Sequence, residues 1–263
     1  ENQPWEFAML QAWKKTNNSK TIGYAHSCIS YWDLRKFFDD DTFLNKEFPT
    51  PDLYALNGKF AKDIFMKNKN QSSKIFLVEA TRYQYLKKVK NNKKSNLKKR
   101  DNNGLINFLV ICDYNFYYTK KQLEMLNSVN SFFLRDYSVT LKPHPAGIKS
   151  FYKYNHNNFQ ITNKPISEII DEVDIVFLSS TTAAALEFYY LGKNIICLLD
   201  QETLNLSPLR GIKNVRFVSD EDQFAELIKN PKIFFTNTSD VKEGFFEFDE
   251  HYSRWLSLIH KNS

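Results

Sequence analysis

The amino-acid sequence predicts an α/β fold with a doubly wound parallel sheet in its C-terminal half. From residue 104 onward, short apolar runs of strand length alternate with single stretches of helical periodicity. Two strands joined by one helix imply a right-handed crossover and parallel pairing. Residues that favour helix ends fall at the same divisions, with Asp220, Glu221 and Asp222 at an expected helix start and Gly192 at an expected helix end.

The C-terminal half is expected to form one domain over residues 104–240. Its predicted strands lie at residues 106–112, 138–141, 175–178, 194–199 and 215–218. Its predicted helices lie near residues 119–134, 167–172, 181–191 and 220–229. Residues 241–263 contain a last amphipathic helix, at about residues 248–260, which we predict to pack across both domains.

The first 86 residues are expected to form a second, partial domain of the same kind. Pro4 stands where a first-turn proline belongs, and apolar residues recur after it at helical spacing. Strands are predicted at residues 21–25, 52–56 and 74–78, a helix at about 59–67 and a weak helix at 32–38. This pattern is half of an α/β domain, and the chain opens without Met. We therefore expect it to be part of a longer protein.

A basic, Asn-rich stretch at residues 87–103 separates the two predicted domains. The chain has a net charge of +6, but eight basic residues and no acid lie between Lys87 and Arg100, so the rest of the chain is slightly acidic. Such a stretch is too polar to pack, and it predicts an interdomain linker. The alternative is peripheral contact with an anionic membrane or a polyanionic acceptor. A nucleic acid is not an expected partner, because no interleaved aromatic residues or nucleic-acid module accompany the run.

The apolar segments and cysteines indicate where the protein resides. No apolar run reaches the roughly 18 residues that a membrane-spanning helix needs, and no signal peptide is recognisable. Cys28, Cys112 and Cys197 lie far apart without CxxC spacing, which predicts free thiols and no zinc site. Free thiols fit a reducing compartment. We expect a cytoplasmic protein, with peripheral contact at the inner face of the cell membrane as an option.

The first candidate site is the tetrapeptide Lys142-Pro143-His144-Pro145, directly after the strand expected to end at Leu141. In open α/β sheets, ligands bind beyond the carboxyl ends of the strands. The two prolines restrict the loop, so Lys142 and His144 are presented at low entropic cost. A cation and an imidazole held in this way suit a phosphate oxygen. The alternative is a histidine that only stabilises a turn.

The second candidate site is Ser179-Ser180-Thr181-Thr182, between a predicted strand and a helix that opens on alanines. Hydroxyl groups and N–H groups at a helix N-terminus can form an anion site, whereas the alternative is a simple helix N-cap. Because both clusters follow neighbouring strands of one sheet, we predict that they bind phosphate together. Glu187, two turns into the helix, can reach a ribose hydroxyl or can be a carboxylate that faces the surface or the linker.

Several motifs of other nucleotide-binding and hydrolytic proteins are absent. No G-x-G-x-x-G, P-loop, Ser-elbow or H-E-x-x-H sequence occurs. Their absence argues against a dehydrogenase, an NTPase and a serine hydrolase. We expect no metal site and no separate cofactor.

The His-Pro loop and the Ser/Thr cluster two elements later resemble the donor half of GT-B glycosyltransferases that use CMP-activated acidic sugars. Bacterial sialyltransferases and Kdo transferases are examples. The resemblance implies two Rossmann-like domains, with the N-terminal one incomplete in this chain. It also implies a nucleotide-sugar co-substrate whose phosphate is bound by His144, Ser180 and Thr181. By position, Lys142, Pro145, Ser179, Thr182 and Glu187 complete the expected donor-binding set.

The N-terminal motifs extend the resemblance. The segments Glu1-Asn2-Gln3-Pro4-Trp5-Glu6, Ile22-Gly23-Tyr24-Ala25-His26-Ser27 and Tyr31-Trp32-Asp33-Leu34-Arg35 resemble bacterial surface-carbohydrate (lipopolysaccharide-associated) biosynthesis proteins. Residues 51–58 are similar to a strand and turn of capsule and teichoic-acid transferases. This similarity implies transfer of an acidic sugar, such as Kdo or a sialic-acid-like sugar, to a bacterial surface glycan.

The sequence leaves the identity of the catalytic base open. The Asp/Glu-Asp/Glu-Gly motif of sialyltransferases is absent, so Glu1 and His26 are the candidates, each expected to face a cleft between the domains. Glu6 is better interpreted as a carboxylate that favours a helix start. The alternative functions are a sugar-nucleotide epimerase or hydrolase of the same fold, a CDP-alditol phosphotransferase and a non-catalytic nucleotide-binding module.

Overall fold

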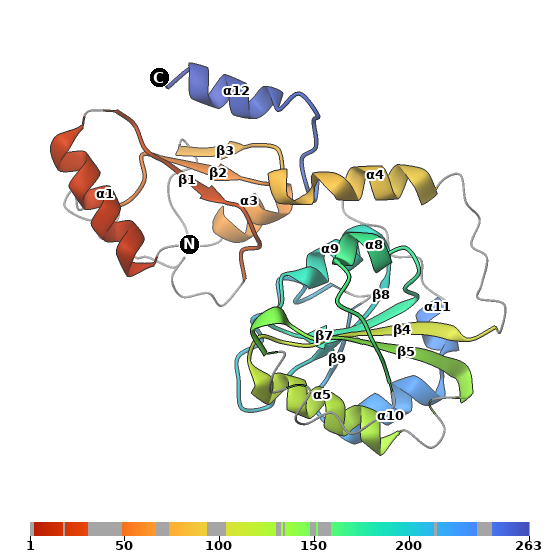
Figure 1. Ribbon diagram of the computed structural model, residues 1–263. Helices are drawn as coiled ribbons and strands as arrows, with labels where there is room; N and C mark the ends of the chain where they lie inside the picture. Colours follow the sequence, from red (N-terminus) through yellow and green to blue (C-terminus); the bar gives the residue numbers. More distant parts are fainter. Residues whose placement is uncertain are drawn as a thin grey trace. The chain divides into compact units, whose positions relative to one another are not determined.

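The computed structural model of the chain contains two compact units (Figure 1). One is made of Glu1–Lys87 with Lys242–Ser263, and the other of Lys88–Val241, so the C-terminal residues return to the N-terminal unit. The structure describes residues 3–17, 19–30, 49–66, 74–93, 104–129, 133, 135–147, 151, 159–212, 215–235 and 244–262.

The N-terminal unit is built on a parallel three-stranded sheet in the order β1-β2-β3. Its strands are β1 (Ile22–Ala25), β2 (Leu53–Leu56) and β3 (Ile75–Leu77). Its helices are α1 (Pro4–Thr16), α3 (Lys59–Met66), the short η3 (Thr81–Tyr83), the start of α4 (Gln84–Lys93) and α12 (Ser253–His260). Successive side chains of a strand point to opposite faces. Tyr54 and Leu56 therefore pack with α3, whereas Leu53 and Ala55 pack with Leu258 of α12.

Glu79, just after β3, attaches α12 to this sheet. Its side chain is fully buried, and its two carboxylate oxygens accept the backbone N–H groups of Arg254 at 3.0 Å and Trp255 at 3.1 Å. The indole Nε1 of Trp255 also donates to the backbone carbonyl of Glu79 at 3.1 Å. A buried carboxylate thus occupies the positive end of the helix dipole, where negative charge is stabilised. The carboxylate fixes where α12 begins.

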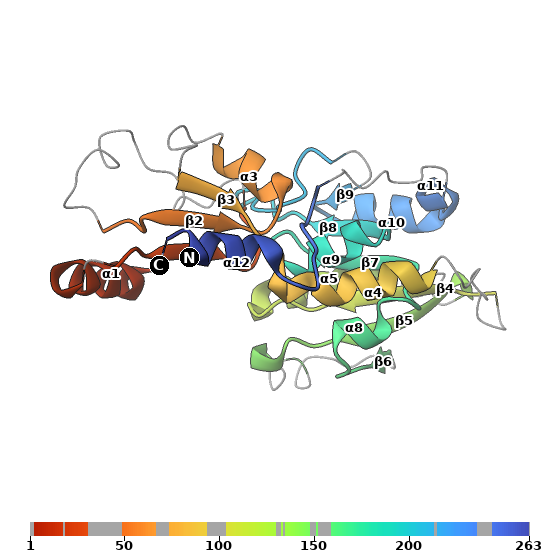
Figure 2. The same ribbon diagram turned by 90° about the horizontal axis from the view of Figure 1, so that it is seen from above.

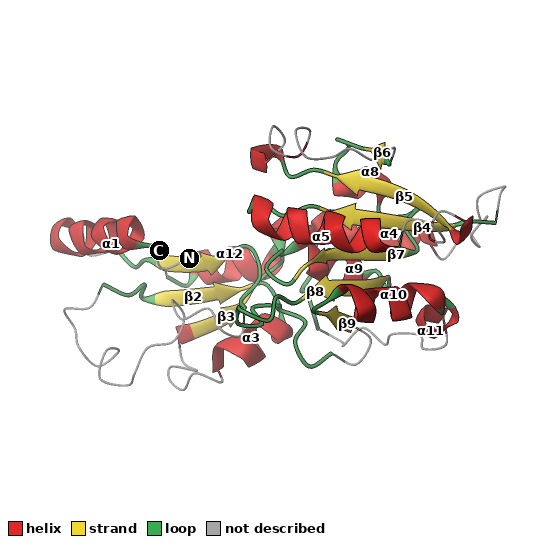
Figure 3. Cartoon of the chain, turned by 90° about the horizontal axis from the view of Figure 1, so that it is seen from below, coloured by secondary structure: helices red, strands yellow, loops and turns green. Residues whose placement is uncertain are grey.

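The C-terminal unit is a six-stranded parallel sheet in the order β6-β5-β4-β7-β8-β9, seen from above in Figure 2. Its strands are β4 (Ile106–Ile111), β5 (Tyr137–Lys142), β6 (Gln160–Ile161), β7 (Ile175–Ser179), β8 (Asn194–Leu198) and β9 (Val215–Val218). Its helices are α5 (Phe116–Ser128), η4 (Pro145–Gly147), α8 (Ile166–Ile169), α9 (Ala184–Tyr190), α10 (Glu221–Lys229) and α11 (Lys232–Phe235). Helices α5 and α10 cover one face of the sheet, and α8 and α9 cover the other (Figures 1 and 3).

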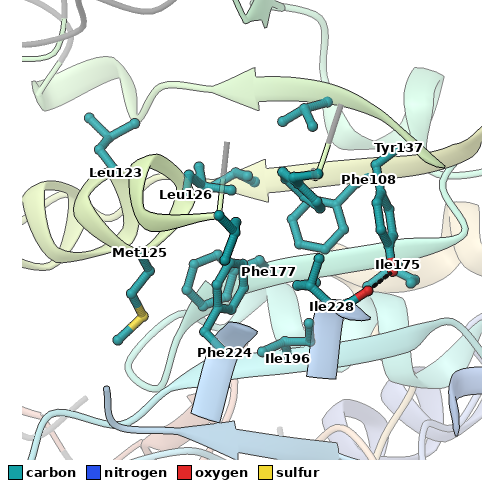
Figure 4. Packing of buried hydrophobic residues seen from close by; sticks show 14 of the residues in the cluster. Phe108, Leu123, Met125, Leu126, Tyr137, Ile175, Phe177, Ile196, Phe224 and Ile228 are labelled. Carbon is teal, nitrogen blue, oxygen red and sulfur yellow. Dashed lines mark hydrogen bonds between the residues drawn. The ribbon is translucent and has the colours of Figure 1, made fainter. Parts of the chain in front are cut away.

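The main core of this unit lies between the sheet and the layer of α5 and α10 (Figure 4). Phe108 and Phe177 from adjacent strands meet Phe224 of α10, and the rings of Phe177 and Phe224 stack at 4.8 Å between centroids. The buried hydroxyl of Tyr137 donates to the carbonyl of Ile228 at 3.0 Å, so its polar atom is satisfied. This core gives the strand ends a rigid support.

The predicted strands are all present, with ends shifted by one residue at most. Helix α5 begins three residues earlier than predicted, because the side chain of Asn115 accepts the N–H of Tyr117 at 3.1 Å and caps the helix there. The predicted helix at 32–38 lies outside the described residues. The two-residue strand β6 and the one-turn helix α11 are too short to show a periodic pattern, and the sequence did not predict them.

Two details of secondary structure differ from the prediction. Residues 84–93 form helix α4, so the predicted linker from residue 87 begins as a helix. Its side chains make contacts: Lys87 Nζ lies 3.9 Å from Glu250 Oε1, and Lys90 Nζ lies 4.5 Å from the ring centroid of Tyr190. The last helix begins at Ser253 rather than near residue 248, because Asp249 accepts the N–H groups of His251 and Ser253 and ends the preceding turn.

Candidate functional site

The strand order of the C-terminal unit indicates where a ligand would bind, because this unit is a doubly wound parallel sheet. In chain order, β4, β5 and β6 run one way from the centre, and β7, β8 and β9 run the other way. The order reverses between β4 and β7, which pair side by side with Ile111 next to Leu178. Ligands of doubly wound folds bind beyond the carboxyl ends of the strands at this reversal. The residues that follow β4, β5, β7 and β8 therefore form the candidate site.

The Lys142–Pro145 loop lies at the end of β5, next to the end of β4. The N–H of Cys112 donates to the carbonyl of Lys142 at 3.0 Å, so the ladder between the strands reaches the loop. Pro143 is buried, His144 is exposed, and residues 145–147 form the short helix η4. Lys142 is half-buried, and this partial burial lowers the pKa of its ammonium group, because burial disfavours the charged form.

His144 is held in one tautomer. The backbone N–H of Ala146 donates to Nδ1 of His144 at 3.2 Å, so Nδ1 carries no proton. In the neutral ring the proton is then on Nε2, on the side of the ring that the loop does not use. The ring of Tyr114 lies edge-on with its centroid 6.2 Å from that of His144. His144 therefore offers an N–H donor at the strand ends, as an anion site requires.

The Ser179–Thr182 loop faces a carboxylate that was not predicted from the sequence. Asp113 follows β4 and is 5% exposed. Its Oδ2 accepts hydrogen bonds from the hydroxyls of both Ser179 and Thr181, the latter at 2.7 Å. Its Oδ1 accepts the N–H of Asn115 at 2.8 Å, and its own N–H donates to Thr119 Oγ1 at 3.0 Å. Asp113 thus ties the loops after β4 and β7 together across the reversal.

Some backbone N–H groups in and after the Ser179–Thr182 loop are hydrogen-bonded within the protein, and others are not. The N–H of Ser180 donates to Leu198 O at 3.0 Å, and that of Ala184 to Thr182 Oγ1 at 3.4 Å. Within the described part of the chain, the N–H groups of Thr181 and Ala183 donate to no acceptor. Ser179 and Ser180 are buried, whereas Thr181 and Thr182 are half-buried. The groups of this loop that can meet a ligand are thus chiefly backbone N–H groups and the Thr181 side chain.

Glu187 lies on α9 and is only 6% exposed. This burial excludes the interpretation of Glu187 as a surface carboxylate. Buried carboxylates in proteins are hydrogen-bonded or paired, and the position of Glu187 beside the loop after β7 keeps a role in ligand binding open as a prediction.

The candidate catalytic residues of the N-terminal domain differ in how far the structure describes them. His26 follows β1 and is exposed, with its ring 6.5 Å from that of Tyr24. Glu1 lies outside the described residues. Glu6 accepts the N–H of Gln3 at 2.7 Å and completes a capping box at the start of α1, as predicted. A pocket of about 170 Å³ opens beside β1, and its lining includes Trp5, Met9 and Tyr54.

An ion pair at the end of β8 was also not predicted. Asp200 is 2% exposed, and its Oδ1 accepts Lys121 Nζ of α5 at 2.9 Å and the N–H of Glu202 at 3.2 Å. Its Oδ2 is buried with no hydrogen-bond partner in the described structure. Burial alone would raise the pKa of Asp200, but the hydrogen bonds from Lys121 and Glu202 and the charge of Lys121 lower it below its usual value.

Replacing Lys121 with methionine is expected to make the stability of the C-terminal unit fall as pH rises. In the native chain the depressed pKa of Asp200 stabilises the fold above about pH 4 and ceases to do so as pH falls through the folded value. Without Lys121, burial dominates, the pKa of Asp200 rises, and the ionised form is destabilising by about 2 kcal/mol. Urea unfolding followed by circular dichroism at pH 4.5 and 7.5 measures this.

The control is Lys120→Met on the same helix, since Lys120 forms an exposed pair with Glu124 at 3.7 Å. Such pairs contribute less than about 0.5 kcal/mol. Equal losses in the two variants, or a Lys121→Met loss that does not depend on pH, would contradict the role assigned to Lys121.

Asp113, Asp200 and Lys121 could in part have been found from sequence. Asp113 directly follows the strand predicted at 106–112, and Asp200 directly follows the one predicted at 194–199. The rule that selected Lys142 and Ser179, a polar residue at a strand end, applies equally to both aspartates. Lys121 carries no such signal, because it lies on a helix and reaches the strand ends only through the fold.

Among the described residues, no helix is long and apolar enough to cross a bilayer, and no group of three His, Cys, Asp or Glu side chains could hold a metal ion. The basic run is described only as far as Lys93, and the rest of it lies outside the described residues. Cys112 and Cys197 are buried, and Cys28 is partly buried, all as free thiols.

Comparisons with known proteins show the fold. No family model and no curated protein matches the sequence. Among solved structures, the UDP-GlcNAc 2-epimerase of Methanocaldococcus jannaschii in complex with UDP-GlcNAc and UDP matches with a TM-score of 0.64 and 12% identity, over 97% of this chain and 73% of its own. MnaA of S. aureus with UDP matches with a TM-score of 0.61 and 9% identity, over 98% and 78%.

A third match is the UDP-GlcNAc 2-epimerase of Neisseria meningitidis bound to UDP-GlcNAc, with a TM-score of 0.59 and 13% identity, over 90% of this chain and 69% of its own. Similarity at this level of identity concerns the fold. The chain has the α/β fold of the GT-B type that the sequence predicted, with parallel sheets in two Rossmann-like parts.

Proposed function

We propose that this chain is an enzyme that binds a nucleotide sugar at the strand ends of its C-terminal unit and transfers the sugar to a glycan. The observation that carries the proposal is the set of anion-binding groups beside the strand-order reversal: Lys142, the Nε2–H of His144 and the backbone N–H groups of Thr181 and Ala183. The solved structures of similar fold contain UDP or UDP-GlcNAc.

In glycosyl transfer, these groups would act when the nucleotide phosphate departs from the sugar. When the bond between sugar and phosphate breaks, negative charge collects on the departing nucleotide phosphate. A cation and fixed N–H donors stabilise that charge more in the transition state than in the bound donor, and such electrostatic stabilisation is often the main source of rate acceleration. No separate cofactor is needed for this step, since the nucleotide sugar is the co-substrate.

The transfer reaction and the glycan acceptor rest on the resemblance of the N-terminal motifs to surface-carbohydrate biosynthesis proteins. Glu1 or His26 would accept the proton of the acceptor hydroxyl. The aromatic pocket beside β1, which includes Trp5 and Tyr54, is a candidate for the acceptor. A cytoplasmic enzyme, with residues 87–100 in contact with an anionic membrane surface, fits this role.

A sugar-nucleotide epimerase or hydrolase is the second candidate function. The solved structures of similar fold favour it, because they are UDP-GlcNAc 2-epimerases or contain UDP. They also favour UDP as the nucleotide, whereas the resemblance of the His-Pro loop favours CMP and a CMP-linked acidic sugar.

Calorimetric titration with CMP, CDP, UDP and GDP is expected to show micromolar binding of one pyrimidine nucleotide. The matching nucleotide sugars are then incubated with and without a glycan acceptor from a surface polysaccharide. Acceptor-dependent release of the nucleotide supports transfer, whereas an epimer or free sugar formed without acceptor supports the second candidate. Binding without any consumption of a donor would indicate a non-catalytic module, and failure of all four nucleotides to bind would refute the proposal.

A further inference from the structure

The hydrogen bonds of Asp113 determine which ligand groups the Ser179–Thr182 loop can accept. A hydroxyl group has one proton to donate and two lone pairs that accept. Three contacts connect these side chains: Ser179 Oγ to Asp113 Oδ2, Thr181 Oγ1 to the same oxygen at 2.7 Å, and Ser179 Oγ to Thr181 Oγ1 at 3.0 Å. Hydrogen bonds to a carboxylate are about twice as strong as those between neutral groups. Both protons therefore go to Asp113.

The consequence differs for the two hydroxyls. Ser179 is 1% exposed and has no route to a ligand, whereas Thr181 is half-buried and keeps a lone pair that is not directed at Asp113. That lone pair can accept a hydrogen bond but cannot donate one. A phosphate oxygen is also an acceptor, so it gains nothing from this hydroxyl. A ligand hydroxyl, which can donate, fits it.

The negative charge of Asp113 also favours a ligand hydroxyl group at Thr181. The Asp113 carboxylate lies directly beside Thr181, with its Oδ2 2.7 Å from Thr181 Oγ1. A negative charge at this point attracts the proton of a ligand hydroxyl group and gives a phosphate oxygen no advantage there. Lys142 and His144 follow β5, on the far side of β4 from β7. In the loop after β7, the backbone N–H groups of Thr181 and Ala183 can bind an anion, whereas the Thr181 hydroxyl can only accept.

We propose that Asp113 is a positioning residue that turns the Thr181 hydroxyl into an acceptor for a hydroxyl group of the ligand, separate from the phosphate site. This inference rests on the proposed nucleotide-sugar function. The ligand hydroxyl comes from the sugar or from the ribose, and these two sources give different results with the free nucleotide.

Replacing Asp113 with asparagine reverses the hydrogen-bond polarity with little change in shape. The side-chain oxygen of the introduced asparagine can still accept the N–H of Asn115, and its amide NH₂ then donates to the hydroxyls of Ser179 and Thr181. The Thr181 proton becomes free to donate, and the negative charge is removed. Calorimetry with pyrophosphate, UDP and UDP-GlcNAc, and with CMP and CMP-sialic acid as a second pair, compares D113N with the native chain.

We expect D113N to bind the nucleotide sugar about tenfold more weakly, the effect of one hydrogen bond, and to bind pyrophosphate as well as or better than the native chain. If the free nucleotide keeps its affinity, the hydroxyl belongs to the sugar; if it weakens equally with the nucleotide sugar, the hydroxyl belongs to the ribose. Thr181→Val, which removes the acceptor and keeps the shape, is expected to show the same pattern, and it serves as the test if D113N does not fold.

The control is Asp174→Asn, because Asp174 accepts the N–H of Asn107 at 3.1 Å near the amino end of the central strand β4, away from the candidate site. If Asp113 has only a structural role, D113N weakens the binding of pyrophosphate and of the nucleotide sugar alike. That result, or unchanged binding of both, overturns this inference and leaves the proposed function standing. Failure of the native chain to bind any nucleotide overturns the proposed function and this inference with it.

Discussion

Replacing His144 with alanine is expected to reduce turnover of the nucleotide sugar by about 100-fold or more while the chain stays folded. Removal of one preorganised donor to a developing negative charge typically costs about 10²- to 10³-fold in rate. The backbone N–H of Ala146 fixes the tautomer of His144, so Nε2–H is such a donor for charge that develops on the departing phosphate. His144 is exposed, so its loss removes little packing. Initial rates of nucleotide release at saturating donor measure the effect.

Two further variants test whether the lost rate comes from the missing N–H donor of His144. His144→Gln keeps an N–H near the position of Nε2 and is expected to recover part of the rate, which a loss of loop structure would not allow. His260→Ala removes an exposed histidine from the last turn of α12 and is expected to leave the rate unchanged. Full activity in a folded His144→Ala variant would mean that the Lys142–Pro145 loop does not serve the reaction.

The sequence predicted the strands of the fold well, because each buried strand is a short apolar run bounded by polar residues. The ends of the helices were predicted less well, since they depend on single side chains. Asn115 moves the start of α5, and Asp249 delays the start of α12. Helix α4 was missed because its lysines suggested a solvated linker, although Lys90 lies over the ring of Tyr190. Local composition does not reveal such contact partners, because the fold brings them together from distant parts of the chain.

The candidate site was predicted in position and only partly in chemistry. Lys142, His144 and the Ser179–Thr182 loop lie at the strand ends where the sequence placed them. The sequence assigned the hydroxyls to phosphate, whereas in the structure the protons of Ser179 and Thr181 are directed at Asp113. Asp113 and Ser179 are 66 residues apart in the chain. Only the pairing of β4 with β7 brings them together, and no local pattern in the sequence encodes that distance.

Glu79→Gln is expected to destabilise the N-terminal unit by about 3 kcal/mol, since an unsatisfied buried group costs about 1–3 kcal/mol and more where a charged hydrogen bond is lost. Both oxygens of the Glu79 carboxylate accept backbone N–H groups of α12, and the side chain is fully buried. Glutamine keeps one acceptor but directs its NH₂ group at the second N–H, so two buried donors face each other. The loss of charge at the start of α12 adds to this.

Tryptophan fluorescence isolates this effect, because all four tryptophans, Trp5, Trp13, Trp32 and Trp255, belong to the N-terminal unit. In urea, the fluorescence transition of Glu79→Gln should move to lower concentration. The control Glu250→Gln changes an exposed carboxylate that lies 3.9 Å from Lys87 Nζ, and surface pairs of this kind contribute under about 1 kcal/mol. If both variants unfold at the native midpoint, α12 is not held by Glu79. If Glu79→Gln alone unfolds early, a single buried carboxylate secures the C-terminal helix on the N-terminal sheet, and the return of the chain to that unit depends on it.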